Sequence, residues 1–241
     1  MKWYIPKEHG AWAMLIVPYW IGATISGVQW IHVIFFLGIF SIYFAQAPLL
    51  TYIRNPKHKD VWASFAIYAV IGLSIMLPIM IMEPALLVIG ICILPLFCIN
   101  LLFAKLKKER LFINDLVAII ALSSLLLLAY RLTEPSLSLE SFTYVLITIL
   151  FYTGSVFHVK SLIREKNNSL FQRWSIVYHI AIIPLSFALQ WYGAAITFSI
   201  SLGKTIFVPT KCLQRPIHIG VVEVINSVVF FIIIVSVYFT W

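Results

Sequence analysis

One polar stretch in the second half of the chain carries the densest set of side chains that can bind or transfer charge. His158, Ser161 and Glu165 recur at i, i+3 and i+7, so they share one face of a helix. Lys160 and Arg164 stand four residues apart on an adjacent face. Two cations beside hydroxyl and imidazole groups suit the oxygens of a phosphate, which accept charge-assisted hydrogen bonds. The alternative is a structural role, in which basic side chains reach the membrane surface and polar ones bond between helices.

A second candidate site is the segment Pro6-Lys7-Glu8-His9-Gly10-Ala11-Trp12 near the N-terminus. Lys7, Glu8 and His9 put three different protonation chemistries beside a glycine, which permits close approach by another backbone. So many ionisable side chains in a short segment favour a binding role. The alternative is an interfacial helix cap, because proline suits a helix start and Glu8 suits the positive end of a helix dipole.

A third candidate lies at the end of the second apolar run. Gln46, Leu50 and Arg54 are spaced by four residues and share one helix face, which aligns a polar side chain within the bilayer with a cation at its end. A buried amide is costly without a partner, so Gln46 needs a neighbouring helix or a ligand. The basic residues that follow also fit a positive sequence that stops translocation.

The remaining candidates are polar side chains within or beside apolar runs: Asn114, Asp115, His179, Glu223 and Asn226. Acids inside a membrane are expensive and are functional candidates when they face the bundle. Asp115 fits equally well as a partner of the helix dipole in a first turn. For Glu223 the alternative is an ion pair with Lys211 or Arg215.

The chemistry of these candidates favours an anionic ligand. The chain has no Gly-Lys-Ser phosphate loop, no paired cysteines, no His-Glu-x-x-His and no Gly-x-Ser-x-Gly. A divalent metal would demand clustered carboxylates, whereas aligned cations with few acids suit a phosphate head group. We therefore expect no metal site and no cofactor.

The composition identifies the elements that must position these residues. Of 241 residues, 62% are hydrophobic and only 11% are charged, and no soluble core of this size can hide so much apolar surface. The chain is therefore expected to be an all-α integral membrane protein. Disordered chains, disulfide scaffolds and soluble nucleic-acid binders are excluded, although the net charge is +8. We expect no removable signal peptide, because the first apolar run lacks a cleavage site.

Charged clusters divide the chain into nine apolar runs, each close to the roughly 20 residues that cross a bilayer. The runs are 11–27, 31–53, 61–82, 84–104, 111–131, 142–162, 173–191, 193–208 and 219–240. If the chain crosses the membrane nine times and its N-terminus lies in the cytoplasm, 16 of the 17 Lys and Arg lie on the cytoplasmic side. Arg131 is then the one Lys or Arg on the outer side. The sequence thus predicts a cytoplasmic N-terminus, an external C-terminus and a site that opens to the cytoplasm.

The chain resembles the YwiC-like family of bacterial membrane proteins in three features. These are the motif Pro6-Lys7-Glu8-His9-Gly10-Ala11-Trp12-Ala13-Met14, the nine apolar runs, and the polar loops after runs two, four, six and eight. The resemblance covers essentially the whole chain, and the Lys-Glu-His-Gly-Ala-Trp stretch is its most specific part. It implies a multi-pass protein of the bacterial cytoplasmic membrane.

The layout is also similar, at greater distance, to the UbiA superfamily of intramembrane prenyltransferases. That similarity implies a bundle of nine helices with motifs after helices two and six, where aspartates spaced by four residues chelate Mg²⁺ on a diphosphate. The corresponding positions here read Gln46, Leu50 and Arg54, then Ser161 and Glu165. Lys160 and Arg164 match the basic residues that flank the second motif and can bind phosphate oxygens directly.

We therefore expect one membrane domain, 1–241, that binds membrane lipid and carries an isoprenoid or phospholipid ligand in a cytoplasm-facing cavity, with no nucleic-acid partner. Whether it catalyses a reaction stays open. The alternative function is a small-solute transporter or an accessory subunit of a membrane complex. A transporter should show paired broken helices near the midplane, whereas an isoprenoid binder should show an apolar tunnel that ends in cations.

Overall fold

The computed structural model describes residues 3–6, 9–208 and 215–240, and all regular secondary structure in these ranges is helical. The helices are α1 His9–Ile25, α2 Trp30–Arg54, α3 Val61–Met82, α4 Pro84–Lys105, α5 Phe112–Ser123, α6 Leu125–Arg131, α7 Leu139–Ile163, α8 Ser169–Ala188, α9 Tyr192–Phe207 and α10 Pro216–Thr240. The predicted all-α class is confirmed for this part of the chain.

Each apolar run corresponds to a helix within a few residues, except the fifth. The fifth run forms one segment over 112–131, but it is not a regular helix throughout, because Ser124 separates α5 from α6 and its hydroxyl donates to the Ile120 carbonyl at 2.8 Å. A hydroxyl that bonds back to the preceding turn offers the backbone an alternative to the regular helix ladder. Within the described part of the chain, six segments are long and apolar enough to cross a membrane: 30–54, 61–82, 84–105, 112–131, 139–163 and 216–240.

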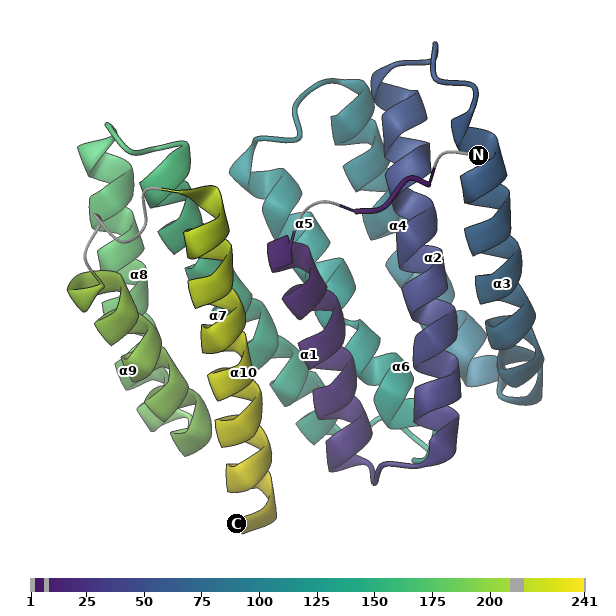
Figure 1. Ribbon diagram of the computed structural model, residues 1–241. Coiled ribbons are helices and arrows are strands. Elements are labelled where there is room, and N and C mark those ends of the chain that lie inside the picture. Colours follow the sequence, from purple (N-terminus) through teal and green to yellow (C-terminus); the bar gives the residue numbers. More distant parts are fainter. Residues whose placement is uncertain (1–2, 7–8, 209–214, 241) are drawn as a thin grey trace.

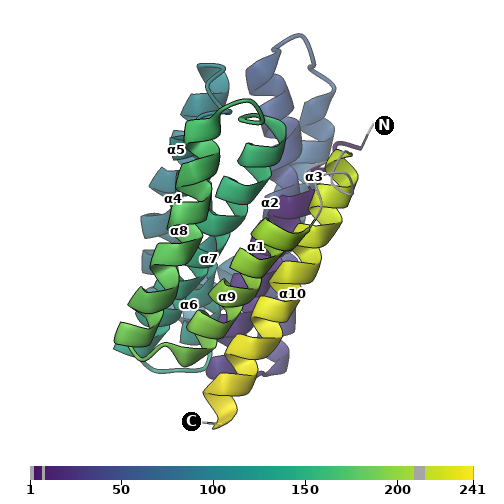
Figure 2. The ribbon, with the colours of Figure 1, turned by 90° about the vertical axis from the view of Figure 1, so that its left-hand side faces the viewer.

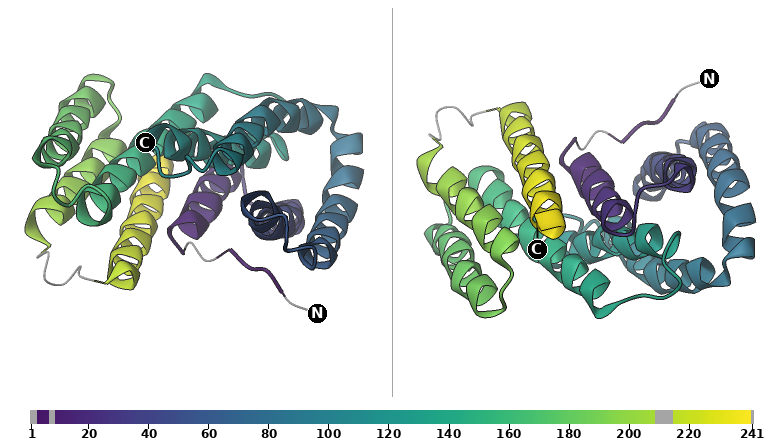
Figure 3. Two further views of the ribbon diagram at one scale, coloured as in Figure 1. Left: turned by 90° about the horizontal axis from the view of Figure 1, so that it is seen from above. Right: turned by 90° about the horizontal axis from the view of Figure 1, so that it is seen from below.

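Helix α1 lies between two groups of helices. Figures 1 and 3 show α2 to α6 on one side of it and α7 to α10 on the other. Its successive faces enter two separate cores, with Leu15, Tyr19 and Ala23 in one and Val17, Ile21 and Ile25 in the other. The four helices α7 to α10 stand together as a bundle when the molecule is seen from that side (Figure 2).

Close backbone contacts at glycines bring the helices together. A Cβ on Gly22 of α1 would lie 2.3 Å from the Leu126 carbonyl oxygen of α6. Gly38 and Gly72 play the same role where α2 crosses α3, since a Cβ on Gly72 would lie 2.9 Å from the Gly38 carbonyl oxygen. Small residues permit this packing between membrane helices, where close van der Waals contact replaces the hydrophobic effect.

The polar loops gather at one end of the bundle. Loops 55–60, 106–111 and 164–168 lie at the top of Figure 1, and we call this the cationic end. Helix α8 begins there with Asn168, whose side chain accepts a hydrogen bond from the Phe171 amide at 3.1 Å. The α1–α2 turn and the end of α10 lie at the opposite end (Figure 1).

Candidate functional site

A buried polar cluster lies inside the α7–α10 bundle and centres on Glu223 of α10. Its carboxylate accepts hydrogen bonds from Ser155 of α7 at 2.7 Å and from the ammonium of Lys204 of α9 at 2.6 Å. His158 Nε2 lies 3.8 Å from the same carboxylate. One turn further along α10, the Asn226 amide donates to the Ser201 hydroxyl at 3.2 Å. We define the buried polar cluster as Ser155, His158, Ser175, His179, Ser201, Lys204, Glu223 and Asn226.

The ion pair at the centre of this cluster is withdrawn from solvent. The side chains of Lys204 and Glu223 are only 7% and 8% exposed. The alternative that Glu223 pairs with Arg215 is wrong, because Arg215 is exposed before α10 and the carboxylate binds Lys204 instead. The other partner considered, Lys211, lies outside the described residues. A buried charge that keeps a paired and hydrogen-bonded counter-ion is characteristic of a specific site within a membrane bundle.

A second buried ion pair joins α5 to α7. Lys160 lies 2.6 Å from the Asp115 carboxylate and also donates to the Arg110 carbonyl at 2.9 Å. Arg164, four residues further on, is exposed because α7 ends at Ile163. Of the two cations, Lys160 is therefore bound in a buried position and Arg164 is exposed at the end of α7.

The remaining predicted residues at the cationic end form local contacts. Arg54 binds Glu109 through two nitrogens, at 2.8 and 2.6 Å, and this pair is largely exposed. Asn114 accepts from Asn100 and donates to the Glu109 carbonyl, both at 3.0 Å. Glu165 accepts from Asn168 within the 164–168 loop at 2.8 Å. These contacts join the ends of α2, α4 and α5 with the loops of the cationic end, and none of them includes a residue of the buried polar cluster.

Two residues of the N-terminal motif, Lys7 and Glu8, lie outside the described residues, and His9 is the first residue of α1. Gln46 is half-buried on α2.

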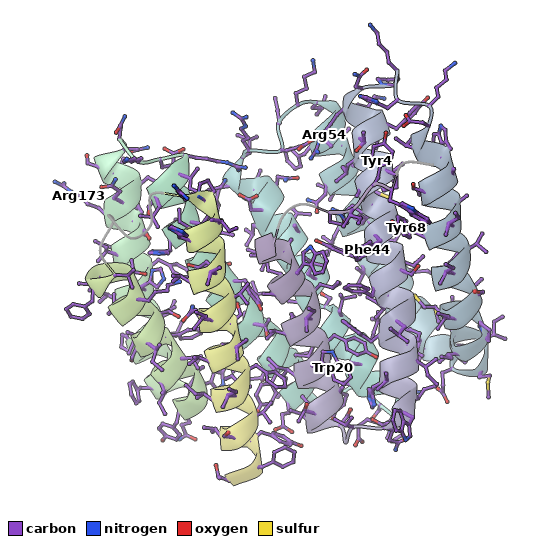
Figure 4. The ribbon with its side chains drawn as sticks, viewed as in Figure 1. Tyr4, Trp20, Phe44, Arg54, Tyr68 and Arg173 are labelled. Atoms are coloured by element: carbon purple, nitrogen blue, oxygen red, sulfur yellow. The ribbon has the colours of Figure 1, made fainter. Side chains whose placement is uncertain are left out.

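The segment before the motif lies against the α2–α3 pair. Figure 4 shows Tyr4, Phe44 and Tyr68 close together, and the Tyr4 hydroxyl donates to Asp60 at 2.6 Å. That hydrogen bond to the carboxylate raises the pKa of Tyr4 above its usual value.

An apolar groove of about 330 Å³ runs between α1 and α10. It is lined by Trp12, Ala13, Ile16 and Val17 from α1 and by Val224, Ser227 and Val228 from α10. The Ser227 hydroxyl donates to the main-chain carbonyl of Glu223, one turn earlier in α10, at 2.8 Å. Behind the groove, the Tyr152 hydroxyl donates to the Ala13 carbonyl at 2.9 Å.

Sequence reasoning missed Lys204 and the groove residues. Lys204 had been assigned only to the positive inner side, although Ser201 three residues before it was a signal that this face of α9 is polar. Among the described residues, no group of three or more His, Cys, Asp or Glu is placed to hold a metal ion.

Comparisons with known proteins connect the chain to one family. The model of the YwiC-like protein family matches residues 5–130. The uncharacterized protein YwiC of Bacillus subtilis strain 168 is 31% identical over 248 residues, which cover 100% of both chains. An uncharacterized protein of Haemophilus influenzae Rd is 26% identical over 235 residues, covering 97% of this chain and 98% of its own. No solved structure matches, so the UbiA-like arrangement of the bundle stays a prediction.

Proposed function

The chain belongs to the YwiC-like family, and from its groove and its charges we propose that this membrane protein binds an amphipathic phosphorylated lipid or isoprenoid. The apolar chain of the ligand lies in the groove between α1 and α10, and the phosphate lies at the cationic end. The observation that carries this proposal is the groove itself, which has apolar walls and includes Val224, the residue directly after Glu223 on α10.

The mouth of the groove is suited to an anion. Helices α1 and α10 run side by side in the same direction, and both begin at the cationic end (Figure 1). The positive ends of their dipoles therefore flank the groove on both sides. His9 is the first residue of α1, and the exposed cation Arg215 directly precedes α10. A phosphate at this mouth meets two helix N-termini, and the exposed Arg215 lies at the start of one of them.

Gly220 keeps the upper part of the groove open. It lies four residues before Val224 and eight before Val228, on the same face of α10 as these lining residues. A Cβ on Gly220 would find no atom within 4 Å. The groove face thus continues toward the cationic end without a side chain at this turn.

The transporter alternative has weaker support. The expected pair of broken helices has one counterpart among the described helices, the break at Ser124. The backbone of Ser124 is still near the helical range, with φ −68° and ψ −12°, so the break is a local irregularity. It does not expose the half-helix ends that bind solutes in such transporters, which favours the lipid-binding proposal.

The proposed orientation places the cationic end in the cytoplasm of a bacterial cell. Nine crossings, with α5 and α6 counted as one, would put 16 of the 17 Lys and Arg on that side. An activity reporter fused after Trp241 is therefore expected to be active only outside the cytoplasm. Reporter activity in the cytoplasm would contradict the count of nine crossings and the orientation together.

Filling the groove is expected to displace the bound lipid. In Val224→Trp the indole ring occupies the space between α1 and α10. The detergent-purified variant should therefore retain about tenfold less phosphorylated lipid, which corresponds to a loss of ~1.4 kcal/mol of binding free energy. Native mass spectrometry followed by lipid extraction measures the amount bound per chain.

The matched control is Val70→Trp, which makes the same change at a 66% exposed position of α3 away from the groove. This variant should retain as much phosphorylated lipid as the unmodified protein. Lipid binding in the groove would be refuted by two results: no co-purifying phosphorylated lipid, or equal retention by Val224→Trp and Val70→Trp.

A further inference from the structure

Two buried histidines in the α7–α10 bundle have ring nitrogens that form no hydrogen bond with any described residue. His158 has no hydrogen-bond partner for either nitrogen, and His179 has none for Nε2. The Ser175 hydroxyl beside them is likewise without a partner in the described part of the chain. These residues are 2%, 1% and 1% exposed. Leaving several polar atoms unpaired in a closed interior costs free energy, which indicates that something small binds there.

The hydrogen bond of His179 fixes which of its nitrogens is the base. Its Nδ1 lies 2.7 Å from the Ser175 carbonyl oxygen. Because a carbonyl oxygen only accepts, Nδ1 carries the hydrogen, and Nε2 of the neutral ring carries a lone pair. That nitrogen lies against Gly154 of α7, where a Cβ would approach it to 3.1 Å. The glycine thus lets a basic nitrogen lie directly against α7.

The second ring lies one helical turn away. His158 follows Gly154 by four residues on the same face of α7. The His179 ring, which comes from α8 and packs against Gly154, therefore lies one turn of α7 away from His158. His158 Nε2 is in turn 3.8 Å from the Glu223 carboxylate. The arrangement is a short row of two bases that ends at an acid.

Charged groups of both signs surround this row. Lys204 from α9 and Glu223 from α10 form an ion pair with no net charge. On the α5 side, Asp115 and Lys160 likewise neutralise each other. With both rings neutral the surroundings carry no excess charge, and a proton on His158 would face the Glu223 carboxylate together with the Lys204 ammonium bound to it.

We propose that His179, His158 and Glu223 form a proton-binding site inside the membrane domain. A proton from water adds to the lone pair of an imidazole, no other covalent bond forms or breaks, and the charge of the site rises by one. The protonated ring then donates toward Glu223, which keeps its bond to Lys204. The two rings are 2% and 1% exposed, and this burial distinguishes the site from the groove between α1 and α10.

Nitrogen-15 NMR of histidine-labelled protein in phosphatidylcholine vesicles tests the proposal without any variant. Between about pH 8 and about pH 4, a range around the ordinary histidine pKa of ~6.5, the signals of His158 or His179 should move from those of a neutral ring to those of a cation. His32 is the internal control, because it is equally buried and both of its nitrogens are bonded, to the Gln29 amide and the Ala129 carbonyl, each at 3.0 Å. Its signals should stay those of a neutral ring.

Proton uptake gives a second readout. On acidification over the same range, the double variant His158→Gln/His179→Gln should take up about one proton fewer per chain than the unmodified protein. Neutral signals from both rings throughout the range would overturn the proposal and assign the unpaired atoms to bound water only. Equal uptake by the two proteins would overturn it as well.

Discussion

Replacing Gly22 by valine is expected to lower the free energy of unfolding by about 3 kcal/mol. A Cβ at this position would lie 2.3 Å from the Leu126 oxygen and 3.0 Å from its carbonyl carbon. Both atoms belong to the α6 backbone, so no side-chain rotation relieves the overlap and α1 must move. Because α1 supplies residues to both cores, that movement disturbs the whole bundle. Unfolding in mixed detergent micelles, followed by tryptophan fluorescence, measures the loss.

Gly220→Val is the matched control for this prediction. It makes the same substitution in helix α10, where the added Cβ meets nothing within 4 Å. The free energy of unfolding should change by about 0.5 kcal/mol or less. If the two variants lose equal stability, the cost comes from valine in a membrane helix and not from the contact between α1 and α6.

The positions of the helices could be predicted from the sequence because the bilayer leaves few solutions for an apolar run of about 20 residues. Charges and prolines mark where such runs end, and Pro84 is indeed the first residue of α4. The break at Ser124 and the contact at Gly22 escaped prediction. Both depend on which helix packs against which, and a single sequence does not contain that information.

The candidate site was predicted residue by residue but not as an arrangement. His158, His179 and Glu223 stood out because polar side chains within apolar runs need partners. Their convergence required the packing of α7 against α8, α9 and α10. Arg164 caps the C-terminal end of α7, where its amide donates to the Lys160 carbonyl, and its side chain is exposed, whereas the Lys160 side chain binds Asp115.

Removing the carboxylate of Glu223 is expected to destabilise the protein by about 3–5 kcal/mol. In Glu223→Ala the ammonium of Lys204, 7% exposed, loses its counter-ion, and the Ser155 hydroxyl loses its acceptor. The same change at an exposed pair is the comparison: Glu109→Ala breaks the contact with Arg54, whose side chain is 48% exposed, and should cost about 1 kcal/mol or less. Unfolding in mixed micelles measures both variants.

A double variant separates the loss of a partner from the loss of the pair. Lys204→Met/Glu223→Met replaces both charges by flexible apolar side chains, so no buried charge is left without its counter-ion. Its free energy of unfolding should therefore exceed that of Glu223→Ala by about 2 kcal/mol or more. A double variant as unstable as Glu223→Ala would mean that the bundle depends on hydrogen bonds to Glu223, such as that from Ser155, more than on its charge.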